Sequence, residues 1–319
     1  MHITTEIGSV NTLTTITRQA IINSLRDQTV VILVLLFLIL VLVSAYLGWS
    51  ATTTVNMIYL HSAEFLVAHD RPVPPNPVLD TSPLVLLRNM ATYVSLIGAL
   101  AAIVVGYQTI AGDRKAEVLP LLGSRPLIQK HYGYGKILAL TIMLLGLVAI
   151  AALINTLAFM LLPEFTLDAT GWLRLGAFYL TSGLYLLVFG LLGLACASYA
   201  RSESVALLVP VTCWLIFTFV LPQLTSNINP VAALNPVSAL ADPPESTFFQ
   251  ITGILLGPVS LAEAYRLISA QLLDFLPPDY VSHSAIAPIW SLLLAGVGLH
   301  FTAIWAIARM DMARGAYHG

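Results

Sequence analysis

Six long apolar stretches constrain the fold of this chain more than any other feature. A helix needs about 20 consecutive, mostly apolar residues to cross the hydrocarbon core of a bilayer. Only 9% of the 319 residues are charged and 58% are apolar, whereas an ordinary soluble protein carries about 25% charged residues. We therefore predict a single-domain, all-α integral membrane protein with six transmembrane helices. The six windows, of which the fifth only just meets the length, are 29–49, 90–111, 137–162, 172–197, 205–221 and 287–308.

The positive charges predict the orientation. Six spans place both termini on one side of the membrane. With the N-terminus inside, ten Lys and Arg residues face the cytoplasm and four, Arg71, Arg88, Arg174 and Arg266, face the outside. Spans two and three are separated by a loop that holds all three lysines, Lys115, Lys130 and Lys136. The positive-inside rule thus predicts cytoplasmic termini and a cytoplasmic loop after span two. We expect the chain to lie in the cell (plasma or inner) membrane.

The segments outside the spans carry weaker signals. Residues 1–28 are polar and lack the apolar core of a cleavable signal peptide, so we expect the first span to be a permanent anchor. Their apolar residues are spaced as in a cytoplasmic helix that lies in the membrane plane. We expect residues 50–89 and 222–286 to be extracytoplasmic. The first has a proline-rich stretch that favours extended backbone, and the second has two Asn-Pro pairs, Asn229-Pro230 and Asn235-Pro236, that favour turns.

A further helix is predicted before the sixth span. Ser260-Leu261-Ala262-Glu263 fits a capping box, in which the serine oxygen and the glutamate carboxylate accept from free amides at a helix start. Apolar residues follow at helical spacing on one face, and the polar residues Glu263, Arg266, Gln271 and Asp274 take the other. We predict an external amphipathic helix that lies on the outer leaflet or packs on the spans.

Motifs for catalysis and for cofactors are missing from the sequence. There is no Gly-x-x-x-x-Gly-Lys-[Ser/Thr] loop for ATP phosphates and no zinc or serine hydrolase signature, so we expect no enzyme activity and no cofactor. A net charge of −2 argues against a nucleic-acid partner. Cys196 and Cys213 lie in apolar runs and indicate buried packing rather than a disulfide or metal site. Among titratable residues only His300 lies inside a span, which is weak support for an ion-coupled transporter.

One group of residues leaves a metal site open. Met57, His61, Glu64 and His69 combine soft and imidazole ligands over a short stretch, and Met57 and His61 would share a helix face. These residues suit copper, but nothing in the sequence fixes a third or fourth ligand. The alternative is an ordinary interfacial segment without a metal.

The loop between spans two and three is the most informative segment. It opens with Asp113-Arg114 at the end of a span, continues through the apolar residues Val118, Leu119, Leu121 and Leu122, and is broken by Ser124-Arg125-Pro126. We expect a short apolar-faced helix, surrounded by cations and held just below the membrane. Such a helix suits a groove on a cytosolic partner. The alternative is a solvated connector whose charges only enforce the topology.

This loop resembles that of type-2 ABC exporter permeases. There, span two ends in a pattern like Glu-Arg-x-x-Gly-Thr-Leu-x-x-Leu-Leu-x-x-Pro, and span three begins after Gly-Lys. The matching residues here are Asp113-Arg114, Leu119, Leu122, Pro126 and Gly135-Lys136. The chain departs from the pattern at Glu117-Val118, at Gly123 and at Pro120. In overall plan, with Leu234-Asn235-Pro236 after span five, the chain is similar to the permeases of nitrous oxide reductase maturation.

The resemblance implies a permease that works with a separate cytosolic ABC ATPase, usually two copies of each. It implies a homodimer or a pair with a related permease, and an extracytoplasmic accessory protein is a further candidate partner beside membrane lipid. ATP hydrolysis would drive export or mechanical transmission through the short cytoplasmic coupling helix. For contact with the ATPase we single out Asp113, Arg114, Leu119, Leu122, Arg125 and Pro126.

Two other classes of function share the composition. A non-transporting scaffold or assembly factor would not need a cation-ringed docking helix. An ion-coupled secondary transporter would need inverted repeats and a buried carboxylate, and the sequence shows neither.

Overall fold

The computed structural model describes residues 3–76, 78, 82–115, 119, 129–161, 167–225, 247–276 and 284–310. All regular structure in these residues is helical. Six helical stretches are long and apolar enough to cross a membrane, and each overlaps one predicted window, which confirms the predicted class. They are Gln28–Ala68, Pro83–Arg114, Gln129–Met160, Ala169–Tyr199, Glu203–Thr225 and Pro288–Ala308.

Two of the six spans contain a π-helical turn. The second span is built from η1 (Pro83–Leu87), α4 (Arg88–Tyr93), the π-helical turn η2 (Val94–Gly98) and α5 (Ala99–Lys115). The fifth span is built in the same way from α9, the π-helical turn η3 and α10, with bounds Glu203–Leu215, Ile216–Val220 and Leu221–Thr225. The remaining spans are single helices: α2 (Gln28–Ala68), α7 (Gln129–Leu161), α8 (Ala169–Tyr199) and α13 (Pro288–Ala308).

The centre of the bundle is α8, which packs against α5, α7, α9 and α13. Glycines bring the backbones of α5 and α8 into direct contact. A Cβ atom built on Gly106 would lie 2.0 Å from the carbonyl oxygen of Gly190, and one on Gly193 would lie 2.2 Å from that of Ile103. Small residues at a helix crossing are how membrane helices approach closely, because lipid supplies little hydrophobic force between them.

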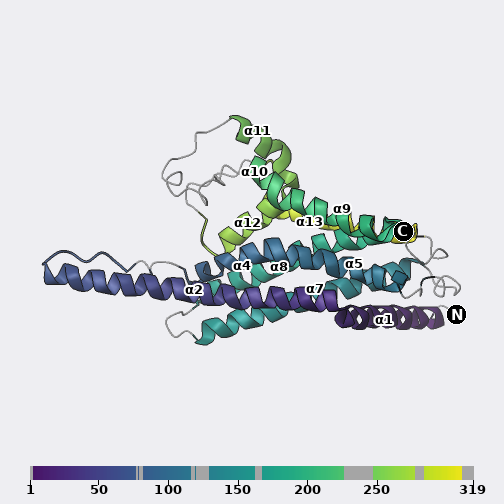
Figure 1. Ribbon diagram of the computed structural model, residues 1–319, viewed down its shortest axis with the longest axis horizontal. Helices are drawn as coiled ribbons and strands as arrows, with labels where there is room; N and C mark the ends of the chain where they lie inside the picture. Colours follow the sequence, from purple (N-terminus) through teal and green to yellow (C-terminus); the bar gives the residue numbers. More distant parts are fainter. Residues whose placement is uncertain are drawn as a thin grey trace.

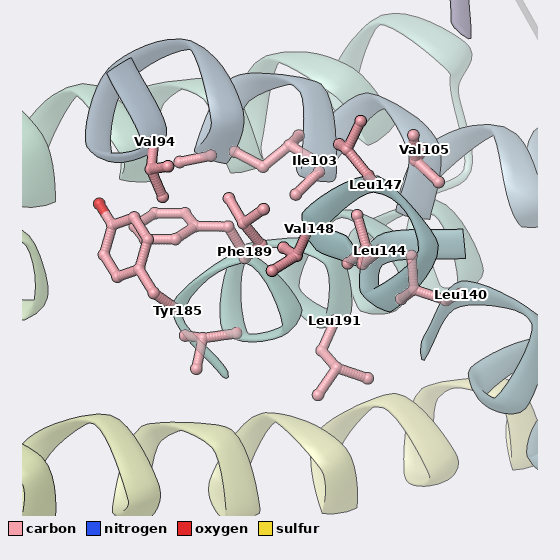
Figure 2. Packing of buried hydrophobic residues seen from close by; sticks show 14 of the residues in the cluster. Val94, Ile103, Val105, Leu140, Leu144, Leu147, Val148, Tyr185, Phe189 and Leu191 are labelled. Atoms are coloured by element: carbon pink, nitrogen blue, oxygen red, sulfur yellow. The ribbon is translucent and has the colours of Figure 1, made fainter. Parts of the chain in front are cut away.

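Apolar side chains fill the space around this crossing. Figure 2 shows side chains of the second span, of α7 and of α8 meeting in one layer. Ile103, Leu144 and Phe189 in this layer are at most 1% exposed, so the three helices enclose it fully. The labelled residues of the layer are Val94, Ile103, Val105, Leu140, Leu144, Leu147, Val148, Tyr185 and Phe189, while Leu191 points away from it on the other side of α8.

The first span is a helix of 41 residues, about twice the predicted length. Residues 50–68, expected to belong to a proline-rich external segment, continue the helix because no glycine or proline follows Gly48 before Pro72. The outer half of α2 projects well past the other helices (Figure 1). Residues 71–76 follow α2 without regular secondary structure, and the Tyr59 hydroxyl donates to the carbonyl of Pro74 among them at 2.9 Å.

The predicted helix before span six exists but is inserted into the bundle. α11 (Thr247–Leu256) and η6 (Gly257–Val259) lead into α12 (Leu261–Leu272), and the two arms meet at 93°, as in a re-entrant loop or a broken span. α12 packs against α8 and α13, which agrees with packing on the spans rather than on the outer leaflet.

The predicted capping box is wrong. The side chain of Ser260 makes no cap hydrogen bond, because its Oγ instead accepts from Thr225 Oγ1 at 3.3 Å. Glu263 was assigned to the polar face but is only 8% exposed. Tyr265 is fully buried, where its hydroxyl meets Ser182 Oγ at 2.8 Å and its ring stacks on Tyr185 with centroids 4.4 Å apart. The sequence pattern described an amphipathic helix, but tertiary packing covers most of both faces.

The N-terminal helix is present as α1 (Ile3–Arg26), and its orientation in the membrane plane stays a prediction. Its first residues and the end of α13 lie at the same end of the molecule (Figure 1), as an even number of spans requires. The Asn-Pro pairs at 229–236 lie outside the described residues.

Candidate functional site

An ion pair joins the two helices that flank the loop between spans two and three. Asp113 lies near the end of α5, and Lys136 lies two turns into α7. The Lys136 ammonium is 2.6 Å from Asp113 Oδ2, and the hydroxyl of Tyr132 donates to the same oxygen at 2.7 Å. Both charged side chains are less than 10% exposed. The residues at which the loop leaves and re-enters the bundle are therefore held against each other inside the protein.

The buried ammonium of Lys136 has partners beyond the carboxylate. It donates to the carbonyl of Thr109 at 2.8 Å and lies 5.3 Å from the centre of the Tyr132 ring. An ammonium has three donors, and burial of a charge is costly unless most of them are satisfied. The arrangement meets this requirement, so it fixes the register of α7 against α5.

Arg114 ties the same end of α5 to α8. Its Nη1 donates to the carbonyl of Ala200 at 3.0 Å, and its Nη2 donates to the carbonyl of Ser198 at 2.8 Å. The last carbonyls of a helix lack intrahelical donors and carry partial negative charge, so a guanidinium there supplies both hydrogen bonds and charge complementarity. Nearly two turns before Asp113 on α5, the Tyr107 hydroxyl donates to Glu203 at the start of α9, at 3.1 Å.

The first two helices join the same network. The Thr17 hydroxyl of α1 donates to the carbonyl of Gly135 at 3.1 Å, and a Cβ on Gly135 would lie 2.8 Å from Ile16. Asp27 caps α2 by accepting from the amides of Thr29 and Val30. Its other carboxylate oxygen accepts from Gln108 at 2.5 Å. We call this set of contacts around Asp113, Arg114 and Lys136 the cytoplasmic clamp, for the side on which the charge pattern places it.

The described site residues lie inside the chain rather than on its surface. The exposed fractions of Asp113, Arg114 and Leu119 are 7%, 9% and 1%. The first two form their polar contacts within the clamp, and the third packs into the apolar core. That these three residues contact an ATPase stays a prediction. The other candidates, Leu122, Arg125 and Pro126, lie outside the described residues.

Sequence reasoning missed Thr109 and Tyr132 as members of the clamp. Thr109 contributes only its carbonyl, which no side-chain pattern can reveal. Tyr132 precedes Lys136 by four residues, and this spacing places both on one helix face. That spacing is the one signal that could have pointed to a shared partner.

The residues considered for a metal do not gather. His61, Glu64 and His69 are exposed along the outer half of α2, and His69 Nδ1 lies 2.8 Å from the carbonyl oxygen of Phe65 in its own helix. Within the described ranges no group of three or more His, Cys, Asp and Glu could hold a metal ion. His300 is partly buried and lies near the Tyr134 ring, with centroids 6.3 Å apart.

Comparison with known families identifies the chain. The family model for ABC-2 family transporter protein matches residues 14–299, which include the first five spans, the first half of the sixth, and the clamp. A search of curated proteins finds no significant match. The helical fold, the six spans and the extent of the match agree. The chain therefore belongs to the ABC-2 transporter family and is a membrane-embedded permease component of an ABC transporter.

Proposed function

We propose that this permease converts ATP hydrolysis by a separate cytosolic ABC ATPase into movement of its spans, and that the loop after α5 is the point of contact. The observation that carries the proposal is the buried Asp113–Lys136 ion pair, which joins both ends of that loop. If the two ends of the loop could move independently, a force applied to the loop would bend the loop and would not move the spans. A force applied to this loop reaches α5 and α7 together.

The clamp distributes the displacement further into the bundle. Arg114 connects α5 to the end of α8, and Thr17 connects α1 to α7. Leu119, buried in the apolar core, ties the loop itself to the spans. In this view Asp113, Arg114 and Leu119 transmit the movement. Contact with the ATPase falls to Leu122, as the apolar anchor, with Arg125 and Pro126 beside it.

The resemblance extends the proposal to the whole complex. The working unit is two permeases, as a homodimer or a pair with a related permease, and two ATPase subunits in a plasma or inner membrane. The clamp and both termini face the cytoplasm, and this chain itself is not an enzyme. Export of a cargo or transmission of force to an extracytoplasmic accessory protein would be the output. The overall plan favours the nitrous oxide reductase maturation subgroup.

The test is to co-express the chain with its cognate ATPase and measure both complex formation and stimulation of ATP hydrolysis. Leu122→Asp should abolish both, because a carboxylate buried in an apolar groove is costly. Lys130→Glu, an exposed change at the other end of the loop, is the control and should leave both intact. Leu119→Asp is unsuitable, because this side chain lies in the core and its loss would unfold the bundle.

A second variant separates contact from transmission. Asp113→Asn removes the ion pair without touching residues 120–128. The ATPase should still bind, but the permease should no longer stimulate hydrolysis. If Leu122→Asp leaves both assembly and stimulation unchanged, the loop is only a connector and the coupling proposal fails.

A further inference from the structure

Two exposed aromatic rings and an arginine pack together where α8 and α13 end. The rings of Tyr199 and Trp305 stack with their centroids 5.9 Å apart and 21° between their planes. The guanidinium of Arg309 lies 4.4 Å from the centre of the Trp305 ring. Tyr199 is 65% exposed and Trp305 is 46% exposed, so this set of three residues, which we call the aromatic stack, lies on the outside of the bundle.

The aromatic stack lies at the level of the cytoplasmic clamp. Tyr199 stands between Ser198 and Ala200, whose carbonyls accept from Arg114. The 21 residues of α13 extend about 31 Å, which matches the thickness of the hydrocarbon core. With the predicted orientation, the end of α13 that carries the aromatic stack therefore lies among the headgroups of the inner leaflet, where Trp and Tyr are enriched in membrane proteins.

An apolar stripe on α13 leads from the bilayer interior to the aromatic stack. Leu294, Val297 and Phe301 are each more than half exposed. They precede Trp305 at intervals of three or four residues, so they share its face of the helix. An acyl chain that lies along this stripe has its headgroup end beside Arg309.

The charge of Arg309 is available to a ligand. Among the described residues no carboxylate lies within ion-pair distance of it. Packing on the Trp305 ring occupies one face of the planar guanidinium and leaves its N–H groups, which point outward from the edge, free to donate. A phosphate accepts two such N–H groups at once in charge-assisted hydrogen bonds.

The same charge argues against a second copy of the chain as the occupant of this face. In a two-fold symmetric dimer whose axis runs along the membrane normal, residues at one depth meet their own copies. Contact through the α13 stripe would bring the two copies of Arg309 together, and facing like charges are unfavourable. An anionic lipid instead supplies the opposite charge at this depth and an apolar chain for the stripe.

We propose that the aromatic stack binds one anionic glycerophospholipid of the inner leaflet, with its phosphate on Arg309 and an acyl chain along Phe301 and Val297. Trp305 and Tyr199 hold the guanidinium at headgroup level. The site depends on the membrane setting of the chain and on its orientation. It does not depend on the coupling proposed for the cytoplasmic clamp, so either proposal can fail without the other.

The experiment is native mass spectrometry of the full chain, released in mild detergent and incubated with phosphatidylglycerol or with phosphatidylcholine of the same acyl chains. We expect bound phosphatidylglycerol to exceed phosphatidylcholine by about fivefold, the effect of one arginine beside an anionic headgroup. Arg309→Gln should remove most of this preference. Arg26→Gln, which changes an exposed arginine at the end of α1, removes the same charge away from the aromatic stack and should retain the preference.

A matched pair of tryptophans tests the role of the ring. Trp305→Ala should lower the preference for phosphatidylglycerol, because the guanidinium is no longer held. Trp290→Ala, at the other end of α13, is the control, since Trp290 is also exposed but has Leu294 instead of an arginine four residues later. Asp311→Asn removes the carboxylate nearest to Arg309 in the sequence and should preserve or strengthen the preference.

Two further measurements distinguish other occupants. Glycerol 3-phosphate, the headgroup anion without a chain, should not displace the lipid at equal concentration. Val297→Cys should form no more disulfide-linked dimer in native membranes than the parent chain does. An unchanged preference in Arg309→Gln, equal loss in Arg26→Gln, displacement by glycerol 3-phosphate, or efficient cross-linking through position 297 would overturn the proposal.

Discussion

Replacement of Gly106 by alanine should weaken the central helix crossing. The added Cβ would lie 2.0 Å from the carbonyl oxygen of Gly190, which is 1.4 Å short of the 3.4 Å at which ordinary contact begins. The obstacle is backbone, so no rotamer change can relieve it, and α5 must move away from α8. Forced packing of this kind costs about 1–3 kcal/mol, and a gap of 0.5–1 Å along the crossing also removes roughly a quarter to a half of each contact energy.

Helix propensity opposes this loss, because alanine favours a helix over glycine by about 1 kcal/mol. We expect Gly106→Ala to lower the free energy of unfolding by about 2 kcal/mol net. Gly112 on α5 and Gly176 on α8 are matched controls, since a Cβ at either position meets nothing within 4 Å. Their alanine variants should be neutral or slightly more stable.

The assay is unfolding in mixed micelles titrated with SDS, followed by helical circular dichroism. A double variant sharpens the result. Gly193→Ala contacts the carbonyl of Ile103 across the same crossing, so once α5 and α8 have separated, the second methyl should cost less than it does alone. A Gly106→Ala protein as stable as the parent, or strict additivity in the double variant, would refute direct backbone contact between the two helices.

Three further predictions follow from the fold and the orientation. Tyr265→Phe should cost about 1 kcal/mol in the same assay, because it loses the 2.8 Å hydrogen bond to Ser182 but keeps the stack on Tyr185; an unchanged stability would show that the hydroxyl contributes nothing. In sealed cells, a thiol reagent should label Lys130→Cys only from the cytoplasmic side and Arg71→Cys only from outside, while Lys136→Cys, at a position 2% exposed, should resist labelling from either side. The purified chain alone should hydrolyse ATP no faster than background, and robust turnover by a homogeneous preparation would contradict the permease assignment.

The spans were predictable because each depends on a local property. A run of apolar residues long enough to cross the hydrocarbon core can be recognised as a span from its own sequence, without knowledge of the rest of the fold. The sequence also contained the reason that α2 continues past Trp49, namely the lack of a helix breaker before Pro72. There the prediction gave too much weight to the prolines that follow.

The clamp and the inserted helix were harder because burial is a property of the whole fold. The local sequence around Asp113 and Arg114 is typical of surface charges. It contains no sign that Lys136 contacts Asp113 and that the end of α8 contacts Arg114. Glu263 misled in the same way: its place on the polar face of a regular pattern did not reveal that other spans would cover it. Local patterns place a charged residue on the surface, and this prediction fails when the residue is buried with partners that are distant in sequence.

The length of α2 has a mechanical consequence. At 1.5 Å per residue its 41 residues extend about 61 Å, roughly twice the thickness of the hydrocarbon core. A rod of that length, capped by Asp27 at its inner end and joined through Tyr59 and Asn56 to residues 74 and 76 in its outer half, would act as a lever arm. A tilt of about 10° at its base would carry its tip sideways by roughly 10 Å. A small rotation near the clamp would thus become a large stroke far outside the bilayer, within reach of anything that rests on the tip.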